Sequence, residues 1–187
     1  PQDTHHAAKG RRRGFLRRFA RDGRGSVAIE FAALAIPFSF LVFAILESCI
    51  SFAAQQVLAN ATDDISRQLR TGQIRAADVT EVTLKQMICG RIDIVMPDGC
   101  PDLVVDLRKY DSFADAAKER IKLKANGDID TTGFAVTPGS SMSKNMLRVF
   151  YRWPVMTDFM RKSMSNLPDG KTLLFSTATW QNEPFDD

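Results

Sequence analysis

Histidine is nearly absent from this sequence, and its position excludes a large class of enzyme sites. Of 187 residues only His5 and His6 are histidine, and both lie in an arginine-rich N-terminal stretch. Residues 7–187 therefore contain no Ser-His-Asp or Cys-His site and no histidine ligand for zinc. They also contain no glycine-rich phosphate loop, HExxH helix or dinucleotide-binding fingerprint. We expect a protein that is not an enzyme and has no cofactor or metal.

Closely spaced acids are the remaining candidates for such chemistry. The pairs Asp63 with Asp64 and Asp128 with Asp130 have a spacing that can be read as a glycosidase dyad or as calcium ligands. Acids this close in sequence are more often solvated faces of helices and loops. We interpret both pairs in that way.

Charge is missing from a long stretch near the N-terminus. No charged residue lies between Glu30 and Glu47, and the apolar run 31–54 has 24 residues. As a helix it is about 36 Å long, which is enough to cross a hydrocarbon layer of about 30 Å. The sequence therefore predicts a transmembrane helix within residues 26–54. For Glu47, near the far end, we expect an interfacial or helix-packing role.

Positive charge is concentrated before this run. Residues 1–26 carry eight basic and two acidic side chains, whereas residues 27–187 carry 17 basic and 20 acidic ones. Because short basic flanks stay in the cytoplasm, we predict a cytoplasmic leader, residues 1–25, and an extracytoplasmic domain, residues 55–187. The leader adjoins the span, so we interpret its arginines as a topology signal beside anionic lipid rather than as a nucleic-acid-binding arm.

The three cysteines fall into two contexts. Cys49 lies in the predicted span, where a buried thiol acts as a small apolar residue. Cys89 and Cys100 lie in the region placed outside the cytoplasm, where disulfides persist. We expect them to form a disulfide that closes the loop GRIDIVMPDG and contributes about 3 kcal/mol to stability.

A secretory signal peptide is the alternative interpretation of the apolar run. Residues 51–53 imitate its small-residue cleavage site, but its apolar core is usually about 7–15 residues long. The run here is longer, and a helical pattern continues beyond it to a stop at Gly72. Apolar residues recur there at four-residue spacing: Val57, Ala61, Ile65 and Leu69.

The rest of the chain predicts a small α+β domain in which the long N-terminal helix packs on an antiparallel sheet. We expect strands over 103–107, 146–155 and 172–180, the second covered on both faces because bulky residues alternate on each. A capping box at 78–81 predicts a helix to about Ile88, closed by Gly90. Residues 126–145 are rich in glycine, serine and threonine and predict a long mobile loop.

Two shorter helices complete the prediction. Ser112 is a candidate cap for a helix with an apolar stripe of Phe113, Ala117 and Ile121. Thr157 is a candidate cap for another, where Met156, Met160 and Met164 form a stripe that we interpret as core packing. A turn at 168–170 leads into the last strand.

The beginning of the apolar run resembles a type IV prepilin. A basic leader ends at Gly25, followed by Ser26-Val27-Ala28-Ile29-Glu30-Phe31. The Glu30-Phe31 pair is similar to the G-x-x-x-x-E-F form of pseudopilins in Tad (tight adherence) pilus systems. The resemblance implies that a prepilin peptidase cuts between Gly25 and Ser26 and that Glu30 and Phe31 serve assembly.

A physical argument about Glu30 stands beside this resemblance. A charged carboxylate at a helix centre costs about 2.5–3.5 kcal/mol to insert in hydrocarbon, and less at an interface. Cleavage before Ser26 would create an α-amine with a pKa near ~7.7, which is able to neutralise Glu30 of the same or a neighbouring subunit. The other interpretation, a glutamate that faces lipid headgroups, stays open.

Later segments resemble the TadE-like family. They are ANATDDISRQLRTGQ, the Cys89 and Cys100 pair followed by LVVDLRKY, then LRVFYRWPV and LLFSTATWQNEPF. Together with GSVAIEF they cover most of residues 24–185. The resemblance implies a minor pilin or pseudopilin in the bacterial inner membrane, with a periplasmic C-terminal domain and possible incorporation in the pilus.

The partners implied by the resemblance are the major pilin, other minor pilins, an inner-membrane assembly platform and a prepilin peptidase, together with membrane lipid and without nucleic acid. A second hypothesis is an uncleaved single-pass scaffold or receptor domain of the cell envelope. A third is a secreted enzyme released after Ala53, which the missing catalytic motifs disfavour.

Overall fold

Helix α2 (Ser26–Arg70) is the longest element of the chain and belongs to two compact units. The computed structural model describes residues 26–96 and 99–185, with only the backbone of Ser26. One unit extends to Ile45 and the other runs from Leu46 to Asp187. The helix has 45 residues and ends two residues before Gly72, whose φ of 71° suits glycine best. The predicted helix stop is confirmed, whereas the predicted leader, 1–25, lies outside the described residues.

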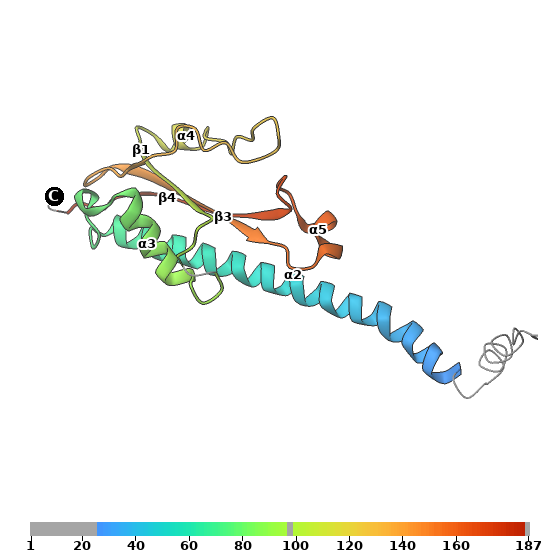
Figure 1. Cartoon of the computed structure of the whole chain (residues 1–187). Coiled ribbons are helices and arrows are strands. Elements are labelled where there is room, and N and C mark those ends of the chain that lie inside the picture. The colour runs from blue at the N-terminus through green and yellow to red at the C-terminus, as the bar shows by residue number, and fades with distance from the viewer. Residues whose placement is uncertain (1–25, 97–98, 186–187) are drawn as a thin grey trace, which may run out of the picture. The chain divides into compact units, whose positions relative to one another are not determined.

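The unit from Leu46 onward is built on a four-stranded sheet in the order β2-β1-β3-β4 (Figure 1). The strands are β1 (Leu103–Tyr110), β2 (Val136–Thr137), β3 (Lys144–Pro154) and β4 (Lys171–Gln181). Strands β1, β3 and β4 pair antiparallel as predicted, but β2 runs parallel to β1. The fold is therefore α+β, as predicted, with a mixed sheet.

One face of the sheet packs against the second half of α2 and against α3 (Glu81–Ile92), as Figure 1 shows. The predicted stripe of α2 is confirmed, except that Leu58 replaces the half-buried Val57 as its fully buried member. Alternate strand residues meet this stripe because side chains of a strand point to opposite faces in turn. The strand residues in this core are Leu103, Val105, Leu107, Leu147, Val149, Tyr151, Trp153, Leu174 and Trp180.

The other face of the sheet is covered by the segment between β1 and β3, which contains α4 (Phe113–Ala116) (Figure 1). Phe134 from this segment stacks on Phe150 of β3, with ring centroids 5.4 Å apart. Ile129 is buried as well. Strand β3 is consequently buried along nearly its whole length, which confirms that both of its faces are covered.

Several local predictions were wrong. The capping box uses Thr80 and Thr83 instead of residues 78–81, because 76–78 form a 3-10 turn, η2 (Ala76–Asp78). Helix α3 also continues through Gly90 to Ile92. Ser112 does cap α4, but this helix ends at Ala116, so the predicted stripe through Ala117 and Ile121 does not form.

The predicted loop 126–145 is irregular over most of its length, as expected, but it also includes strand residues. It contains β2 and the first residues of β3. An isolated bridge joins Ile129, within this segment, to Leu123, just before it. Its glycines and its one proline are compatible with an extended chain that lies over the sheet, because here tertiary contacts outweigh weak local propensity.

The predicted disulfide is present. Cys89 of α3 is bonded to Cys100, which lies three residues before β1, with Cα atoms 5.8 Å apart. Ile92 and Met96, within the closed loop, are buried in the core. The disulfide therefore fixes the end of α3 to the start of the central sheet.

An ion pair joins α3 to α2. Arg91 Nε donates to Asp64 Oδ2 over 2.7 Å, and Arg67 Nη2 lies 3.1 Å from Asp64 Oδ1. These hydrogen bonds, first that of Arg91 and then that of Arg67, hold the pKa of Asp64 below its ordinary value of 3.8. Asp64 is thus a structural partner of two arginines.

Loss of the disulfide should lower the free energy of unfolding of the full-length protein in detergent by about 3 kcal/mol, because the unfolded chain regains the entropy of an open loop. The comparison is chemical denaturation of the wild type, of Cys89→Ser/Cys100→Ser, and of Cys49→Ser. The last variant, which removes an exposed free thiol, should unfold like the wild type. Equal stability of all three proteins would contradict this role.

The Asp64 pair should give a pH-dependent contribution to stability. Because its folded pKa is lowered, the contribution is present above the unfolded pKa of about 4 and is lost as the pH falls through the folded value. Asp64→Asn should therefore cost about 0.2–1 kcal/mol at neutral pH, and the difference from wild type should shrink in acid. Chemical denaturation of wild type and variant at neutral and at acidic pH measures this difference in stability. The control is Asp63→Asn, a change of the exposed neighbouring acid. A difference that grows in acid would contradict the assignment.

Candidate functional site

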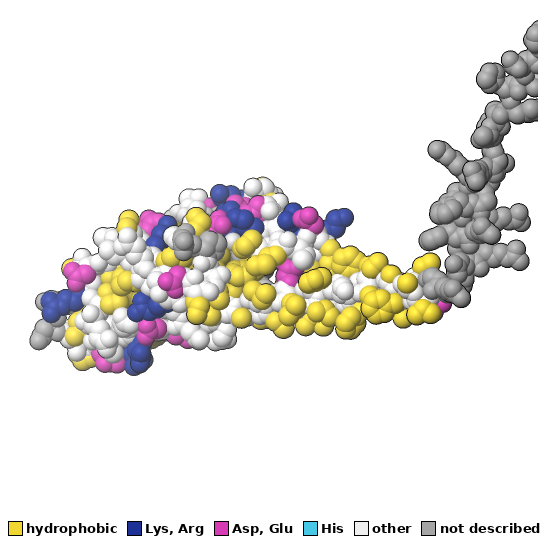
Figure 2. Space-filling view, turned by 60° about the horizontal axis from the view of Figure 1, so that its bottom comes forward, with side chains coloured by type: hydrophobic (Ala, Val, Ile, Leu, Met, Phe, Trp, Pro, Cys, Tyr) yellow, Lys and Arg dark blue, Asp and Glu magenta, His cyan; other side chains and the backbone are white. Residues whose placement is uncertain are grey.

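The N-terminal part of α2 has an apolar surface. From Val27 to Leu46 every side chain except Ala35 and Ala44 is exposed, and most are hydrophobic (Figure 2). Within the described part of the chain, α2 is the one helix long and apolar enough to cross a membrane. Its 20 residues from 27 to 46 span about 30 Å, close to the thickness of a hydrocarbon core. This part of the helix is compatible with single-pass membrane anchoring.

The residues predicted for processing and assembly belong to the start of this surface. Gly25 lies outside the described residues, and Ser26 is at the start of α2. Glu30 and Phe31 are adjacent, and both side chains are exposed. They are accessible to a neighbouring chain or to lipid. The residues predicted for assembly and for the disulfide lie in different units. Glu30 and Phe31 are in the first unit, and the bonded Cys89 and Cys100 are in the second.

Glu47 is a buried carboxylate at the point where one side of α2 begins to be buried. It is 6% exposed and accepts hydrogen bonds from the main-chain N–H groups of Met156 and Thr157 and from the Thr157 hydroxyl. These donors belong to the turn between β3 and α5 (Asp158–Met164). Ionised acceptors form the stronger hydrogen bonds of proteins. Glu47 and its three donors, called the Glu47 latch below, fix this turn to α2.

The latch agrees with one of the two roles expected for Glu47, that of helix packing. The predicted cap of α5 was wrong in its bonding, because Thr157 is the N-cap residue but its side chain makes no cap hydrogen bond. Its hydroxyl donates to Glu47 instead. The sequence signal for the latch was a single acid after an uncharged helical run. Its partner, 110 residues later, had no local signal.

A mostly apolar hollow of about 380 Å³ lies beside the latch. It is enclosed by α2, by the end of α5 and by the start of β4. Ser48 Oγ is 4.0 Å from Met164 Sδ at this point. The lining residues are Ser48, Ser51, Phe52, Gln55, Met164, Thr172 and Leu174. The expected core packing of the methionine stripe was wrong, since Met156 is exposed and Met160 and Met164 are only half-buried.

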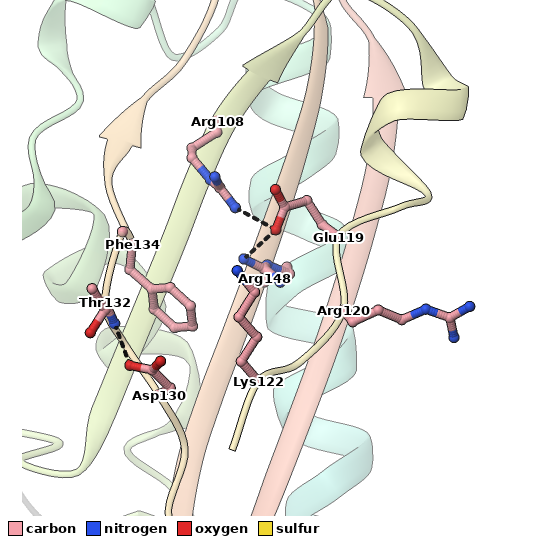
Figure 3. Close-up of a pocket in the computed structure, with 9 residues that line it drawn as sticks. Arg108, Glu119, Arg120, Lys122, Asp130, Thr132, Phe134 and Arg148 are labelled. Atoms are coloured by element: carbon pink, nitrogen blue, oxygen red, sulfur yellow. Dashed lines mark hydrogen bonds and ion pairs between the residues drawn. The ribbon is translucent and has the colours of Figure 1, made fainter. Parts of the chain in front are cut away.

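A buried polar cluster lies on the second face of the sheet (Figure 3). Asp106 of β1 and Arg148 of β3 are register partners, and Arg148 Nε and Nη2 donate to Asp106 Oδ2 over 2.9 and 2.6 Å. Arg108 lies 3.0 Å from the other oxygen of Asp106 and 3.2 Å from Glu119. Asp106 also accepts the N–H of Ala135. Two arginines and two acids thus bind the covering segment to the sheet.

This cluster lines a small hollow of about 130 Å³. Glu119 already occupies the position between Arg108 and Arg148 where an anion would bind, and Arg120 points away from it (Figure 3). Arg148 Nη1 is buried and has no hydrogen-bond partner among the described residues, but its guanidinium lies 5.1 Å from the centroid of the Phe134 ring. A cation over an aromatic face is stabilised there. The charged residues around the hollow bind one another, so they stabilise the fold of the domain.

The acid pairs considered for catalysis have structural partners. Asp64 pairs with two arginines, as described above, while Asp63 is exposed. Asp128 lies 2.9 Å from Arg152 Nη2, and Asp130 accepts the N–H of Thr132. Hydrogen bonds from Thr132, first that of its side chain and then that of its main-chain N–H, lower the pKa of the Asp130 carboxyl. Among the described residues, no group of three or more histidines, cysteines or acids is placed to hold a metal.

A comparison with family models matches residues 25–67 to the family described as TadE-like protein. The match covers the Ser26–Phe31 segment, the apolar run and most of the amphipathic part of α2. It confirms the predicted resemblance over these residues, including the first part of the segment ANATDDISRQLRTGQ, while the segments from Cys89 onward lie outside it. No curated protein and no solved structure matches the chain.

Replacing Glu47 should release the turn before α5. In Glu47→Leu the N–H groups of Met156 and Thr157 lose their acceptor, which costs about 1–3 kcal/mol for buried groups. Amide hydrogen exchange of the full-length protein should show faster exchange at these two residues, with little change in β1 and β3. The matched control is Asp158→Asn, an acid whose side chain is 89% exposed, which should leave the exchange unchanged. Unaltered exchange in Glu47→Leu would contradict the latch.

Proposed function

Because residues 25–67 of this chain match the family described as TadE-like protein, we propose that it is a minor pilin or pseudopilin that acts structurally in assembly of a Tad-type pilus and secretion system. The observation that carries the proposal is the division of one continuous helix. Its first part is apolar, with Glu30 and Phe31 near its start, and its second part is the core helix of an α+β domain. Such a chain presents a folded domain while its apolar part packs in lipid or among like helices.

Processing is the first step of this function. A prepilin peptidase would cleave between Gly25 and Ser26 and remove the basic leader. The new α-amine at Ser26 and the carboxylate of Glu30 are one helical turn apart in sequence, so they form complementary charges on the same or neighbouring subunits. Complementary charges are favourable in a low-dielectric surrounding, where each charge alone is costly.

The partners and location follow from the same proposal. The protein would sit in the inner membrane of a bacterium with the leader inside and the α+β domain in the periplasm, in agreement with the excess of arginine before the span. An oxidising compartment on that side suits the Cys89–Cys100 disulfide. The partners would be the major pilin, other minor pilins and the inner-membrane assembly platform. The protein would serve as a primer or as the pilus tip, and not as an enzyme.

The test of this function separates processing from assembly. Gly25→Leu should keep the leader, which mass and N-terminal analysis of the membrane-extracted protein would show, and should abolish pili. Gly14→Leu, a matched change within the leader, should give the normal start at Ser26. Glu30→Ala should be processed normally but should reduce pilus formation strongly, because the complementary charge is lost.

The uncleaved scaffold makes the opposite predictions. It would keep its leader in the wild type and would be indifferent to Glu30→Ala. Normal pili in Gly25→Leu would contradict the pilin proposal in particular.

A further inference from the structure

The β3–α5 turn and helix α5 have an exposed surface that does not fit a water-facing element. Met156 is 66% exposed and Phe159 is 57% exposed, and the adjacent Arg161 and Lys162 are also exposed. Two large apolar side chains beside two basic ones are typical of a segment that lies in a membrane interface. Met156, Phe159, Arg161 and Lys162 are called the α5 patch below.

The position of the α5 patch along the chain is set by the Glu47 latch. Glu47 directly follows Leu46 at the point where one side of α2 becomes buried, although Ile50 and Phe52 on its other side stay exposed, and its carboxylate holds the turn that contains Met156. The end of α5 is held as well, through the contact of Met164 with Ser48. Both ends of α5 therefore lie within one helical turn of Glu47, where one side of α2 becomes buried.

We propose that the α5 patch lies in the headgroup region of the membrane, on anionic phospholipid of the leaflet from which the α+β domain emerges. This inference rests on the membrane anchoring of the proposed function. An apolar helix from 27 to 46 spans about 30 Å, so that Glu47 and α5 come to the level of the headgroups. Met156 and Phe159 then enter the acyl boundary, and Arg161 and Lys162 meet lipid phosphates.

The same geometry implies a membrane span shorter than the one predicted from the sequence. With hydrocarbon up to Ala54, as the sequence predicted, α5 would lie inside the apolar layer together with its charged residues. Asp158 and Arg161 form an exposed ion pair with 2.9 Å between their atoms, and Lys162 is exposed beside them. Charged side chains in hydrocarbon are costly. A span over 27–46 avoids this cost and leaves the buried side of α2 beyond Glu47 to the protein core.

The experiment uses the full-length protein in nanodiscs of phosphatidylcholine and phosphatidylglycerol, in a Cys49→Ser background so that one introduced thiol carries a fluorophore. The labelled variants are Phe159→Cys, Ile36→Cys in the apolar helix, and Val82→Cys on α3, which is 65% exposed like the patch residues. Lipids with a spin label near the headgroup or within the acyl chain quench a fluorophore that reaches them. We expect quenching at Phe159, mainly by the headgroup label, quenching at Ile36 by the acyl-chain label, and none at Val82.

The outcomes are distinguishable. Quenching at Ile36 without quenching at Phe159 would overturn the α5 proposal and leave the anchored pilin intact. A blue-shifted but unquenched label at Phe159 would mean that a second protein chain covers the patch, and it would overturn the proposal too. The absence of quenching at Ile36 would remove the anchoring itself and with it the proposed function. Unchanged circular dichroism of each variant controls for folding.

A charge variant tests the lipid class independently. Each basic side chain near an anionic surface strengthens the contact by about fivefold. Arg161→Ala/Lys162→Ala should therefore lower the headgroup quenching of the Phe159 label in anionic nanodiscs toward its value in neutral ones. Equal quenching of the charge variant and its parent in both lipids would overturn the role of the basic residues.

Discussion

The change of surroundings along one helix is the constraint on which this structure depends. Helix α2 has one backbone and one hydrogen-bonding pattern, but its side chains face outward on nearly all sides up to Leu46 and bury one side in a protein core from Glu47 onward. An α-helix satisfies its own backbone groups, so it is able to pass between such environments without a break. Only the side chains need to change, and Glu47 is the residue at which they do.

In the α+β unit both faces of the sheet are covered, and the two faces are held in different ways. The face toward α2 and α3 is apolar and is held by close packing, whereas the other face combines stacked aromatic rings with the Asp106, Arg148, Arg108 and Glu119 cluster. Burial makes such charges costly unless they are paired and hydrogen-bonded. The arginine fork supplies several donors in fixed geometry, which allows one arginine to bind an acid from a neighbouring strand and to lie over an aromatic ring.

These two features bear on function in different ways. The polar cluster is closed on itself, because the chain's own Glu119 occupies the position of an anion, so it stabilises the domain. Most of the exposed large hydrophobic side chains among the described residues belong to α2 and to the turn and helix that Glu47 attaches to it. This distribution supports the structural role in assembly that we propose.

The amino-acid sequence by itself determined the apolar helix, its basic flank, the α+β class, the three long strands and the disulfide, because each depends on local composition, periodicity or compartment. It also determined the Gly25–Phe31 pattern, since that motif is contiguous. Only the tertiary structure decided where Glu47 and Thr157 meet, how Asp106 pairs with Arg148, and that residues 126–145 include a strand. These contacts join residues far apart in the chain, and a side chain carries no local signal of the partner that folding brings to it.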